Sequence, residues 1–194
     1  MGLVLGSTTD GISRRRALMI APFALGGAAA VLSQVGRSSG GSEQDVGIID
    51  FDAAGRKLGP AVRKKEVRSD GDWRRQLTTA QYWSARRGST DTPYTGTYYQ
   101  LETAGLFRCV CCGNALFSSS SKFDSGTGWP SFSAPVAAEN ISTQTDNSLP
   151  VERVEVMCRL CSAHLGHVFD DGPPPGGLRY CINESALRFV PSPG

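Results

Sequence analysis

Short apolar runs separated by turn residues dominate the chain from Thr92 onward. Such runs, bounded by Gly, Pro, Asn and Ser, are typical of antiparallel strands joined by tight connections. The chain holds 23 glycines and 11 prolines, which also favours many turns over long helices. We therefore expect a mainly β domain, with strands at Gly96–Leu101, Leu106–Cys109, Val151–Cys158, Leu178–Ile182 and Ala186–Val190.

A short helical segment precedes these strands, between Asp70 and Arg87. Thr78 or Thr79 can cap a helix there, because a threonine hydroxyl accepts a hydrogen bond from a free amide of the first turn. Gly88 is a natural helix stop. We expect one or two short helices before the strands, with an apolar side made by Trp73, Leu77, Tyr82 and Trp83.

The first 36 residues have the pattern of a targeting segment. Ser13–Leu18 reads Ser-Arg-Arg-Arg-Ala-Leu, a twin-arginine-like start, and residues 17–32 are uncharged and rich in alanine. These 16 residues are short for a spanning helix, which needs about 20, and fit the apolar part of a signal peptide. We expect export to the periplasm; an uncleaved membrane anchor and an organellar transit peptide are the alternatives.

The rest of the chain divides into a connecting segment and a folded domain. Residues 37–64 are expected to form a linker and an N-terminal arm, in which the apolar patch Val46–Phe51 predicts either a strand or a docking segment. The domain itself is expected at 65–194, beginning near Lys65.

The charge balance excludes one broad class of function. The chain carries 20 Lys and Arg against 18 Asp and Glu, a net charge of +2. A nucleic-acid binder that depends on a bulk positive field is therefore not expected. Hydrophobic residues make up 40% of the chain, enough for one modest core, and nothing in the sequence indicates an obligate oligomer, so we expect a monomer.

Four of the six cysteines form two CxxC pairs, Cys109/Cys112 and Cys158/Cys161. Each pair turns tightly and directs two sulfurs to one point, so the two pairs together predict a single tetrahedral Zn²⁺ site. Their separation exceeds the usual compact spacing of about 15–20 residues, which predicts an insertion between the halves of the site. Two disulfides or two redox-active dithiols are the alternatives.

Cys181 stands apart from both pairs, in the expected strand Leu178–Ile182. Arg179 and Asn183 alternate with it along the chain, so all three side chains are expected on one face. A neighbouring cation favours the thiolate, the reactive form of cysteine. The pattern predicts a nucleophile; a buried structural cysteine is the alternative.

Both histidines of the chain lie just after the second CxxC pair, as His164 and His167. Four thiolates already complete a tetrahedral zinc site, which leaves the imidazoles free for acid–base work. Completion of a metal site is the alternative. Asp171 follows closely and is expected to orient an imidazole, and the turn Gly172–Gly177 would fold this segment back beside Cys181.

Several segments together resemble one known family, the B-type methionine sulfoxide reductases. The resemblance covers about Lys65 to Pro191 and leaves out roughly the first 60 residues. The segments that carry it are Leu77-Thr78, Gln81-Tyr82, Thr95–Tyr98, Cys109–Gly113 with Leu116-Phe117, Gly126–Phe132, His164–Gly172 and Arg179–Asn183.

This resemblance implies a fold of two small antiparallel sheets, called a β-tent, with short N-terminal helices and a four-cysteine zinc site. It implies reduction of the R epimer of methionine sulfoxide in peptides and proteins, a repair reaction under oxidative stress. Cys181 would be the nucleophile, passing through a sulfenic acid, and Trp129 would form the apolar wall that receives the substrate methyl group. His164, His167, Asp171, Arg179 and Asn183 would surround the nucleophile.

One departure from the family concerns regeneration of the nucleophile. Many relatives carry a second, resolving cysteine where this chain has Thr127. Either an external thiol, such as a thioredoxin-like reductant, attacks the sulfenic acid directly, or Cys111 resolves it after a loop movement. Cys111 is the one cysteine that the other predictions leave unassigned.

Two other classes of protein share parts of this pattern. A zinc-ribbon module that binds nucleic acid or protein would explain the CxxC pairs, but it leaves Cys181 and both histidines without a role. Among basic residues only Arg108 and Arg159 adjoin the pairs, so a basic stripe is missing. A thiol–disulfide oxidoreductase acting through a CxxC predicts a βαβ context, which the pattern lacks.

Overall fold

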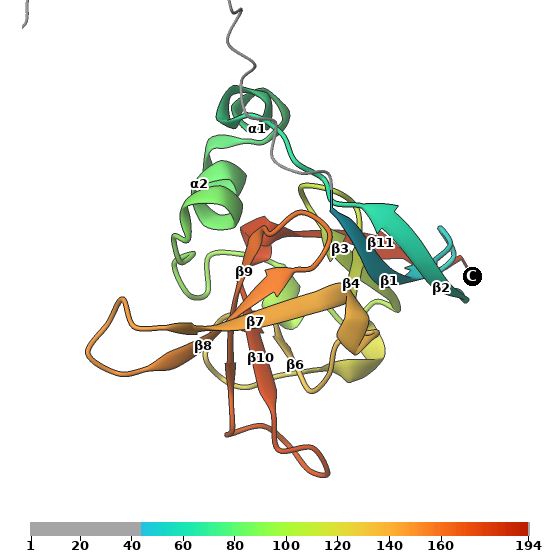
Figure 1. Cartoon of the computed structure of the whole chain (residues 1–194). Coiled ribbons are helices and arrows are strands. Elements are labelled where there is room, and N and C mark those ends of the chain that lie inside the picture. The colour runs from blue at the N-terminus through green and yellow to red at the C-terminus, as the bar shows by residue number, and fades with distance from the viewer. Residues whose placement is uncertain (1–43, 194) are drawn as a thin grey trace, which may run out of the picture. The chain divides into compact units, whose positions relative to one another are not determined.

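The computed structural model describes residues 44–193, which form three antiparallel sheets and two short helices (Figure 1). The expectation of a mainly β fold is confirmed. The largest sheet has six strands, in the order β5 (Lys122–Phe123), β6 (Ser131–Phe132), β10 (Arg179–Ile182), β9 (His164–Phe169), β8 (Arg153–Cys158) and β7 (Ile141–Asp146). The second has three, β11 (Leu187–Pro191), β3 (Gly105–Cys109) and β4 (Ala115–Ser118).

The targeting segment expected at residues 1–36, and residues 37–43 of the expected linker, lie outside the described residues. Within residues 44–193, none of the helices has the length and apolar character needed to cross a membrane.

The third sheet is a hairpin of β1 (Asp45–Phe51) and β2 (Lys57–Lys64). Ile49 is buried, and its backbone N–H donates to Oδ1 of Asn140 at 2.7 Å while Nδ2 of Asn140 donates back to the Ile49 carbonyl at 2.9 Å. The strand alternative for Val46–Phe51 is therefore confirmed. These bonds also attach the arm to the fold, ahead of Lys65 where we expected the domain to begin.

Two helices follow, α1 (Asp70–Gln76) and α2 (Thr79–Arg87). Thr78 caps α2 and forms a reciprocal capping box with Gln81, and Gly88 ends the helix in the left-handed conformation. The cap and the stop are as expected. Of the expected apolar side, Trp83 is an exception, because its side chain is 50% exposed.

Four of the five expected strands are present within one to two residues of their expected bounds. The fifth, Gly96–Leu101, is wrong: a 3-10 turn, η1, occupies Tyr98–Gln100. The backbone N–H of Tyr98 donates to the Glu184 carboxylate at 2.7 Å instead of to a neighbouring strand. A side chain distant in sequence therefore overrides the local β pattern.

The core joins the two larger sheets through aromatic rings. Phe107 of β3 and Phe117 of β4 both pack on Phe132 of β6, with ring centroids 5.0 and 4.5 Å apart. All three side chains are fully buried. Because β6 pairs directly with β10, this packing fixes the strand that carries Cys181.

Candidate active site

Cys181 lies at the centre of the six-stranded sheet, between two neighbouring strands. On β9 it pairs with His167, and on β6 it pairs with Ser131. Residues directly opposite each other on antiparallel strands share one face, with Cβ atoms about 4.5–5.5 Å apart. The sheet register therefore brings the isolated cysteine and one of the two histidines together.

Gly166 makes this close pairing possible. Its φ is +153°, and a Cβ there would lie 2.1 Å from the backbone oxygen of Cys181. No side chain fits at that separation, so the residue between the histidine positions must be glycine.

A cavity of about 140 Å³ opens beside Cys181. Trp129 forms part of its wall and is fixed there, because its indole Nε1 donates to the Asp91 carbonyl at 2.8 Å. The cavity is thus the place where the expected nucleophile, a histidine and the expected apolar wall meet. Its remaining lining includes Arg153, His167, Phe169, Ile182 and Asn183.

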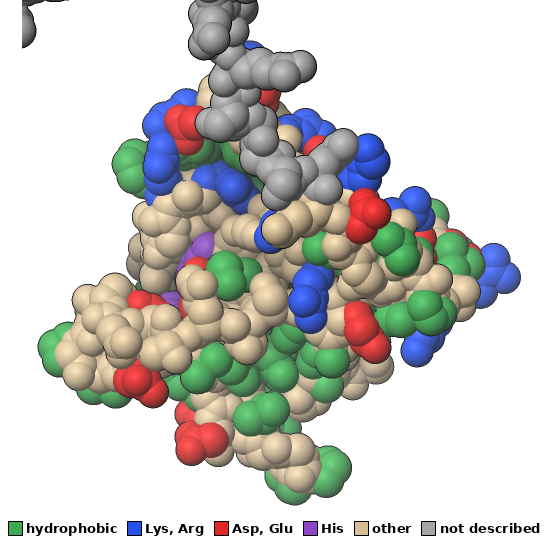
Figure 2. All heavy atoms as spheres, viewed as in Figure 1, with side chains coloured by type: hydrophobic (Ala, Val, Ile, Leu, Met, Phe, Trp, Pro, Cys, Tyr) green, Lys and Arg blue, Asp and Glu red, His purple; other side chains and the backbone are tan. Residues whose placement is uncertain are grey.

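Each histidine is held by a carboxylate. Nε2 of His167 lies 2.7 Å from Oδ2 of Asp146, and Nδ1 of His164 lies 2.6 Å from Oε1 of Glu155. The rings themselves are 5.5 Å apart, edge to face. Both side chains are buried and show only as small recessed areas in Figure 2.

These contacts determine which ring nitrogens carry hydrogen. An ionised carboxylate only accepts hydrogen bonds, so Nε2 of His167 and Nδ1 of His164 are the donors. In the neutral rings, Nδ1 of His167 and Nε2 of His164 therefore hold lone pairs. Nε2 of His164 is buried and has no hydrogen-bond partner in the part of the chain that the structure describes.

The charge states agree with this arrangement. Hydrogen bonds from Ser148 and His167 hold the pKa of the Asp146 carboxyl below its usual range, and Arg153 adds an ion pair at 2.6 Å. Burial lowers the pKa of His167, which outweighs the opposing hydrogen bond to Asp146. The neutral imidazole is therefore the favoured form near neutral pH.

Asp171 does not orient an imidazole, contrary to expectation. Its carboxylate accepts two hydrogen bonds from Arg179, at 2.8 Å from Nε and 2.9 Å from Nη2. Since Asp171 lies beyond the end of β9, its nearest partner is the guanidinium of the adjacent strand β10. The function expected of Asp171 is carried out by Asp146 and Glu155.

The expected thiolate at Cys181 also needs correction. Burial raises the pKa of the thiol, and the lowering effects of Arg179 and of a hydrogen bond from Thr127 only partly offset it. The negative charge of Asp171 raises the pKa of Cys181, so it opposes the lowering effect of Arg179. The thiol is thus the favoured form near neutral pH.

Asn183 lines the cavity and connects two of the segments around it. Its Oδ1 accepts from the Asp91 backbone N–H at 2.9 Å, and its Nδ2 donates to the Leu165 carbonyl at 3.3 Å. The loop that holds Trp129 through the Asp91 carbonyl is therefore tied to the end of β10 as well.

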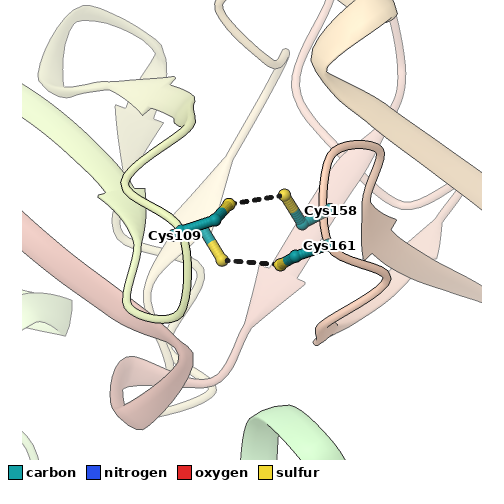
Figure 3. Close-up of side chains that lie close together, drawn as sticks. Cys109, Cys158 and Cys161 are labelled. Atoms are coloured by element: carbon teal, nitrogen blue, oxygen red, sulfur yellow. Dashed lines mark hydrogen bonds between the residues drawn. The ribbon is translucent and has the colours of Figure 1, made fainter. Parts of the chain in front are cut away.

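The four CxxC cysteines form one cluster away from this cavity. The sulfurs of Cys109, Cys112, Cys158 and Cys161 all lie within 4.8 Å of one another. Two tight loops face each other across the cluster, with Sγ–Sγ distances of 3.6 Å for Cys109–Cys161 and for Cys112–Cys158 (Figure 3). The arrangement is that of a metal site.

Groups around the cluster hold its loops in place. Nδ2 of Asn114 lies 3.6 Å from the Cys158 sulfur, and Arg86 of α2 donates to the Cys161 carbonyl at 2.9 Å. Cys111 is buried in the same region, where its carbonyl accepts from Gln76 at 2.6 Å. It does not line the cavity beside Cys181.

Sequence reasoning missed three residues of the site: Asp146, Arg153 and Glu155. They belong to β7 and β8, where Asp146 pairs with Arg153 and Glu155 pairs with His167 in the sheet register. Asp146 and Arg153 have opposite charges on the two sides of the β7–β8 connection, which was a weak signal. Nothing local in the sequence connects them to the histidines.

Comparison with known proteins gives a consistent picture. The family model described as the SelR domain matches residues 77–191. The chain is 52% identical over 130 residues to "Peptide methionine sulfoxide reductase MsrB" of Hahella chejuensis, covering 67% of this chain and 94% of that protein. The protein of the same name from Herminiimonas arsenicoxydans is 45% identical over 132 residues, covering 68% of this chain and 96% of its own. "Peptide methionine sulfoxide reductase B1, chloroplastic" of Arabidopsis thaliana is 50% identical over 122 residues, covering 62% of this chain and 60% of that protein.

Proposed function

This chain belongs to the SelR-domain family of B-type methionine sulfoxide reductases, and on that premise we propose how its residues carry out the reaction. The protein is a peptide-methionine (R)-S-oxide reductase. The observation that supports the assignment of roles is the pairing of Cys181 with His167 beside a cavity walled by Trp129.

Cys181 is the nucleophile of the proposed reaction. Its sulfur attacks the electrophilic sulfur of the sulfoxide and supplies the two electrons that reduce it. The oxygen passes from the substrate to Cys181, which becomes a sulfenic acid, and methionine leaves. The thiol proton ends on the transferred oxygen, so no other reductant is needed in this step.

His167 moves the proton. With Nε2–H bound to Asp146, the lone pair on Nδ1 is free to take the thiol proton and return it to the sulfoxide oxygen. This transfer converts the half-buried thiol, whose pKa is raised, into the reactive thiolate during the attack. His164 assists this proton transfer. Its ring adjoins that of His167, and Glu155 holds it in place.

The other cavity residues position substrate. Trp129 receives the methyl group, and its asymmetric placement relative to His167 distinguishes the two epimers. Arg179, neutralised by Asp171, and Asn183 hold the strand and the loop that define the cavity. Arg179 also opposes the burial effect on the pKa of Cys181.

Regeneration of Cys181 is assigned to an external thiol. Thr127, whose side chain hydrogen-bonds Cys181, stands where many relatives have a resolving cysteine. Cys111 is buried near the metal cluster and outside the cavity, which favours direct attack by a thioredoxin-like or other thiol reductant. Oxidised proteins and peptides are the substrates.

Zn²⁺ is the metal proposed for the cysteine cluster. A tetrahedral Zn²⁺ with Zn–S bonds of about 2.3 Å would place its sulfurs about 3.8 Å apart. The 3.6 Å separations of Cys109–Cys161 and Cys112–Cys158 fit that geometry. The metal would join the loop after β3 to the loop after β8 and supply folding free energy.

Export is proposed from the twin-arginine-like start at Ser13–Leu18. A fusion of residues 1–44 to a reporter that is active only in the periplasm tests it. Changing Arg15 and Arg16 of the fusion together to Lys should abolish the reporter activity. As a control, changing Lys57 and Arg63 of β2 to neutral residues in the full chain should leave its export unaffected. Reporter activity that survives the double change in the fusion would refute the route.

Turnover of separated R and S epimers tests the enzyme assignment. The full chain, loaded with zinc, is given a blocked methionine sulfoxide and a small dithiol. Reduction of the R epimer alone, lost in Cys181→Ser, is the expected result. Turnover of the S epimer, or turnover that survives Cys181→Ser, would contradict it.

A further inference from the structure

A second cavity, of about 460 Å³, lies directly beside the one that contains Cys181. Trp129 lines both. Consecutive residues are also divided between them: Thr90 lines the first and Asp91 the second, and Asn183 lines the first and Glu184 the second. The two cavities are therefore neighbours that share a wall.

The wall of the second cavity is held in place by hydrogen bonds. The Glu184 carboxylate accepts from the backbone N–H of Tyr98, and the Asp91 carboxylate accepts from the backbone N–H of Ser185 at 2.8 Å. Gly96 lies against the Glu184 carboxylate at the edge of the cavity, where a Cβ would lie 1.9 Å from Oε2 of Glu184 and would displace it. The cavity is thus formed before any ligand arrives.

The sizes of the two cavities fit different parts of a peptide. The cavity beside Cys181 is below the range of roughly 300–1,000 Å³ that is usual for small-molecule sites. It has room for a single side chain, and its shared wall at Trp129 leads to the second cavity. The second cavity falls within that range and is open to solvent.

The lining of the second cavity mixes apolar and polar side chains, and its charged residues are acidic. Gln81, Thr92 and Thr95 offer amide and hydroxyl groups. Asp91 and Glu184 are its charged residues, and no Lys, Arg or His is among the described residues that line it. The donors to both carboxylates are neutral N–H and O–H groups, which leave the negative charges uncompensated.

We propose that this cavity is a subsite for a residue next to methionine sulfoxide in a peptide substrate, and that it accepts neutral or cationic side chains in preference to acidic ones. The inference rests on the reductase function and adds a sequence preference to it. It also gives Trp129 two contacts, one with the sulfoxide side chain and one with the flanking chain.

Peptides that differ in one flanking residue test the subsite. Each carries a single methionine-R-sulfoxide with Lys, Ala or Glu before or after it, and a blocked single-residue sulfoxide serves as the reference. On at least one side, kcat/KM should be about two- to fivefold higher for Lys than for Glu, as for a charge contact near the surface. The reference substrate has no flanking side chain.

Ala80→Lys makes the test specific to the cavity. Ala80 is exposed on α2 and lines the second cavity, so the change adds a cation there. It should reduce or invert the preference for Lys while leaving turnover of the blocked substrate unchanged. Thr92→Lys, at another exposed position of the lining, should do the same.

Ala53→Lys is the matched control, because Ala53 is exposed in the turn between β1 and β2 and lines neither cavity. Equal kcat/KM for all peptides, or the same effect from Ala53→Lys as from Ala80→Lys, would overturn the subsite. Absence of turnover on the blocked R sulfoxide would instead overturn the reductase function itself.

Discussion

Nε2 of His167 donates its hydrogen to Oδ2 of Asp146 across 2.7 Å, which ties the centre of β9 to the end of β7. The same carboxylate oxygen accepts from Arg153 at 2.6 Å. The imidazole is therefore held in one orientation and one tautomer by a residue at the edge of the sheet. The proton transfer proposed for His167 depends on that tautomer.

Asp146→Asn should lower kcat by about tenfold or more with little change in KM, because an amide group no longer selects the Nε2–H tautomer. Asp146 raises the pKa of His167 against the effect of burial. Its loss should therefore lower that pKa further and shift the acidic limb of the kcat profile to lower pH.

The pH profile of kcat for the R epimer checks this prediction. Asp124→Asn is the control, since Asp124 is exposed and lies outside the cavity. An unchanged acidic limb, together with unchanged kcat, would mean that Asp146 does not act through His167.

Arg179→Gln and Asp171→Asn should move the pKa of Cys181 in opposite directions. Arg179 lowers that pKa, so its loss should raise it, whereas Asp171 raises it, so its neutralisation should lower it. At a fixed pH below the pKa, Cys181 should react with iodoacetamide more slowly in the first variant and faster in the second, since the thiolate is the reactive form.

Mass spectrometry of the Cys181 peptide over a pH series measures these rates. Asp70→Asn provides a control for loss of a charge in an ion pair, because Asp70 pairs with Arg74 and Arg87 on the helices. Rates that change in the same direction in both Cys181-site variants would contradict the electrostatic explanation.

Thr127→Cys should convert the enzyme to intramolecular resolution. The Thr127 side chain already hydrogen-bonds Cys181, so a sulfur at that position would lie close to the sulfenic acid. One equivalent of substrate should produce a disulfide between positions 127 and 181 in this variant. In the unmodified protein the sulfenic acid should persist and be trapped by a dimedone-type reagent.

Cys111→Ser separates the two routes of regeneration. Cys111→Ser should leave the disulfide of Thr127→Cys and the trapping of the sulfenic acid unchanged, because Cys111 does not line the cavity. A disulfide between Cys111 and Cys181 in the unmodified protein would show that the buried thiol does resolve the intermediate.

Removal of the Zn²⁺ proposed for the cysteine cluster should unfold the domain. Zinc binding at four thiolates is worth roughly 10–16 kcal/mol, comparable with the whole stability of a domain, about 5–15 kcal/mol. Cys161→Ser should therefore lose both the metal and the thermal transition, as should prolonged chelation. Cys111→Ser should retain one equivalent of zinc and a nearly unchanged Tm.

Metal analysis and calorimetry provide the test. A Cys161→Ser protein that contains no metal, yet unfolds with the same Tm as the unmodified protein, would refute a stabilising role for the cluster.

The sequence alone determined the local features of this protein. Caps and stops are short-range, so Thr78 and Gly88 fixed α2, and the CxxC spacing fixed which sulfurs share each loop. The alternation around Cys181 and the nearby histidine pair identified Cys181, His167 and Asn183, which line the cavity, but they did not identify Arg153, which also lines it.

Tertiary structure decided what these residues do to one another. The local pattern at Gly96–Leu101 favoured a strand, but the Glu184 carboxylate accepts a hydrogen bond from its backbone. Asp171 bonds to Arg179 because it lies just beyond the end of β9, where Phe169 pairs with Arg179. Burial then raised the pKa of Cys181 although a cation stands beside it. Hydrogen-bond choice and desolvation depend on neighbours far apart in the chain, and no short-range pattern contains them.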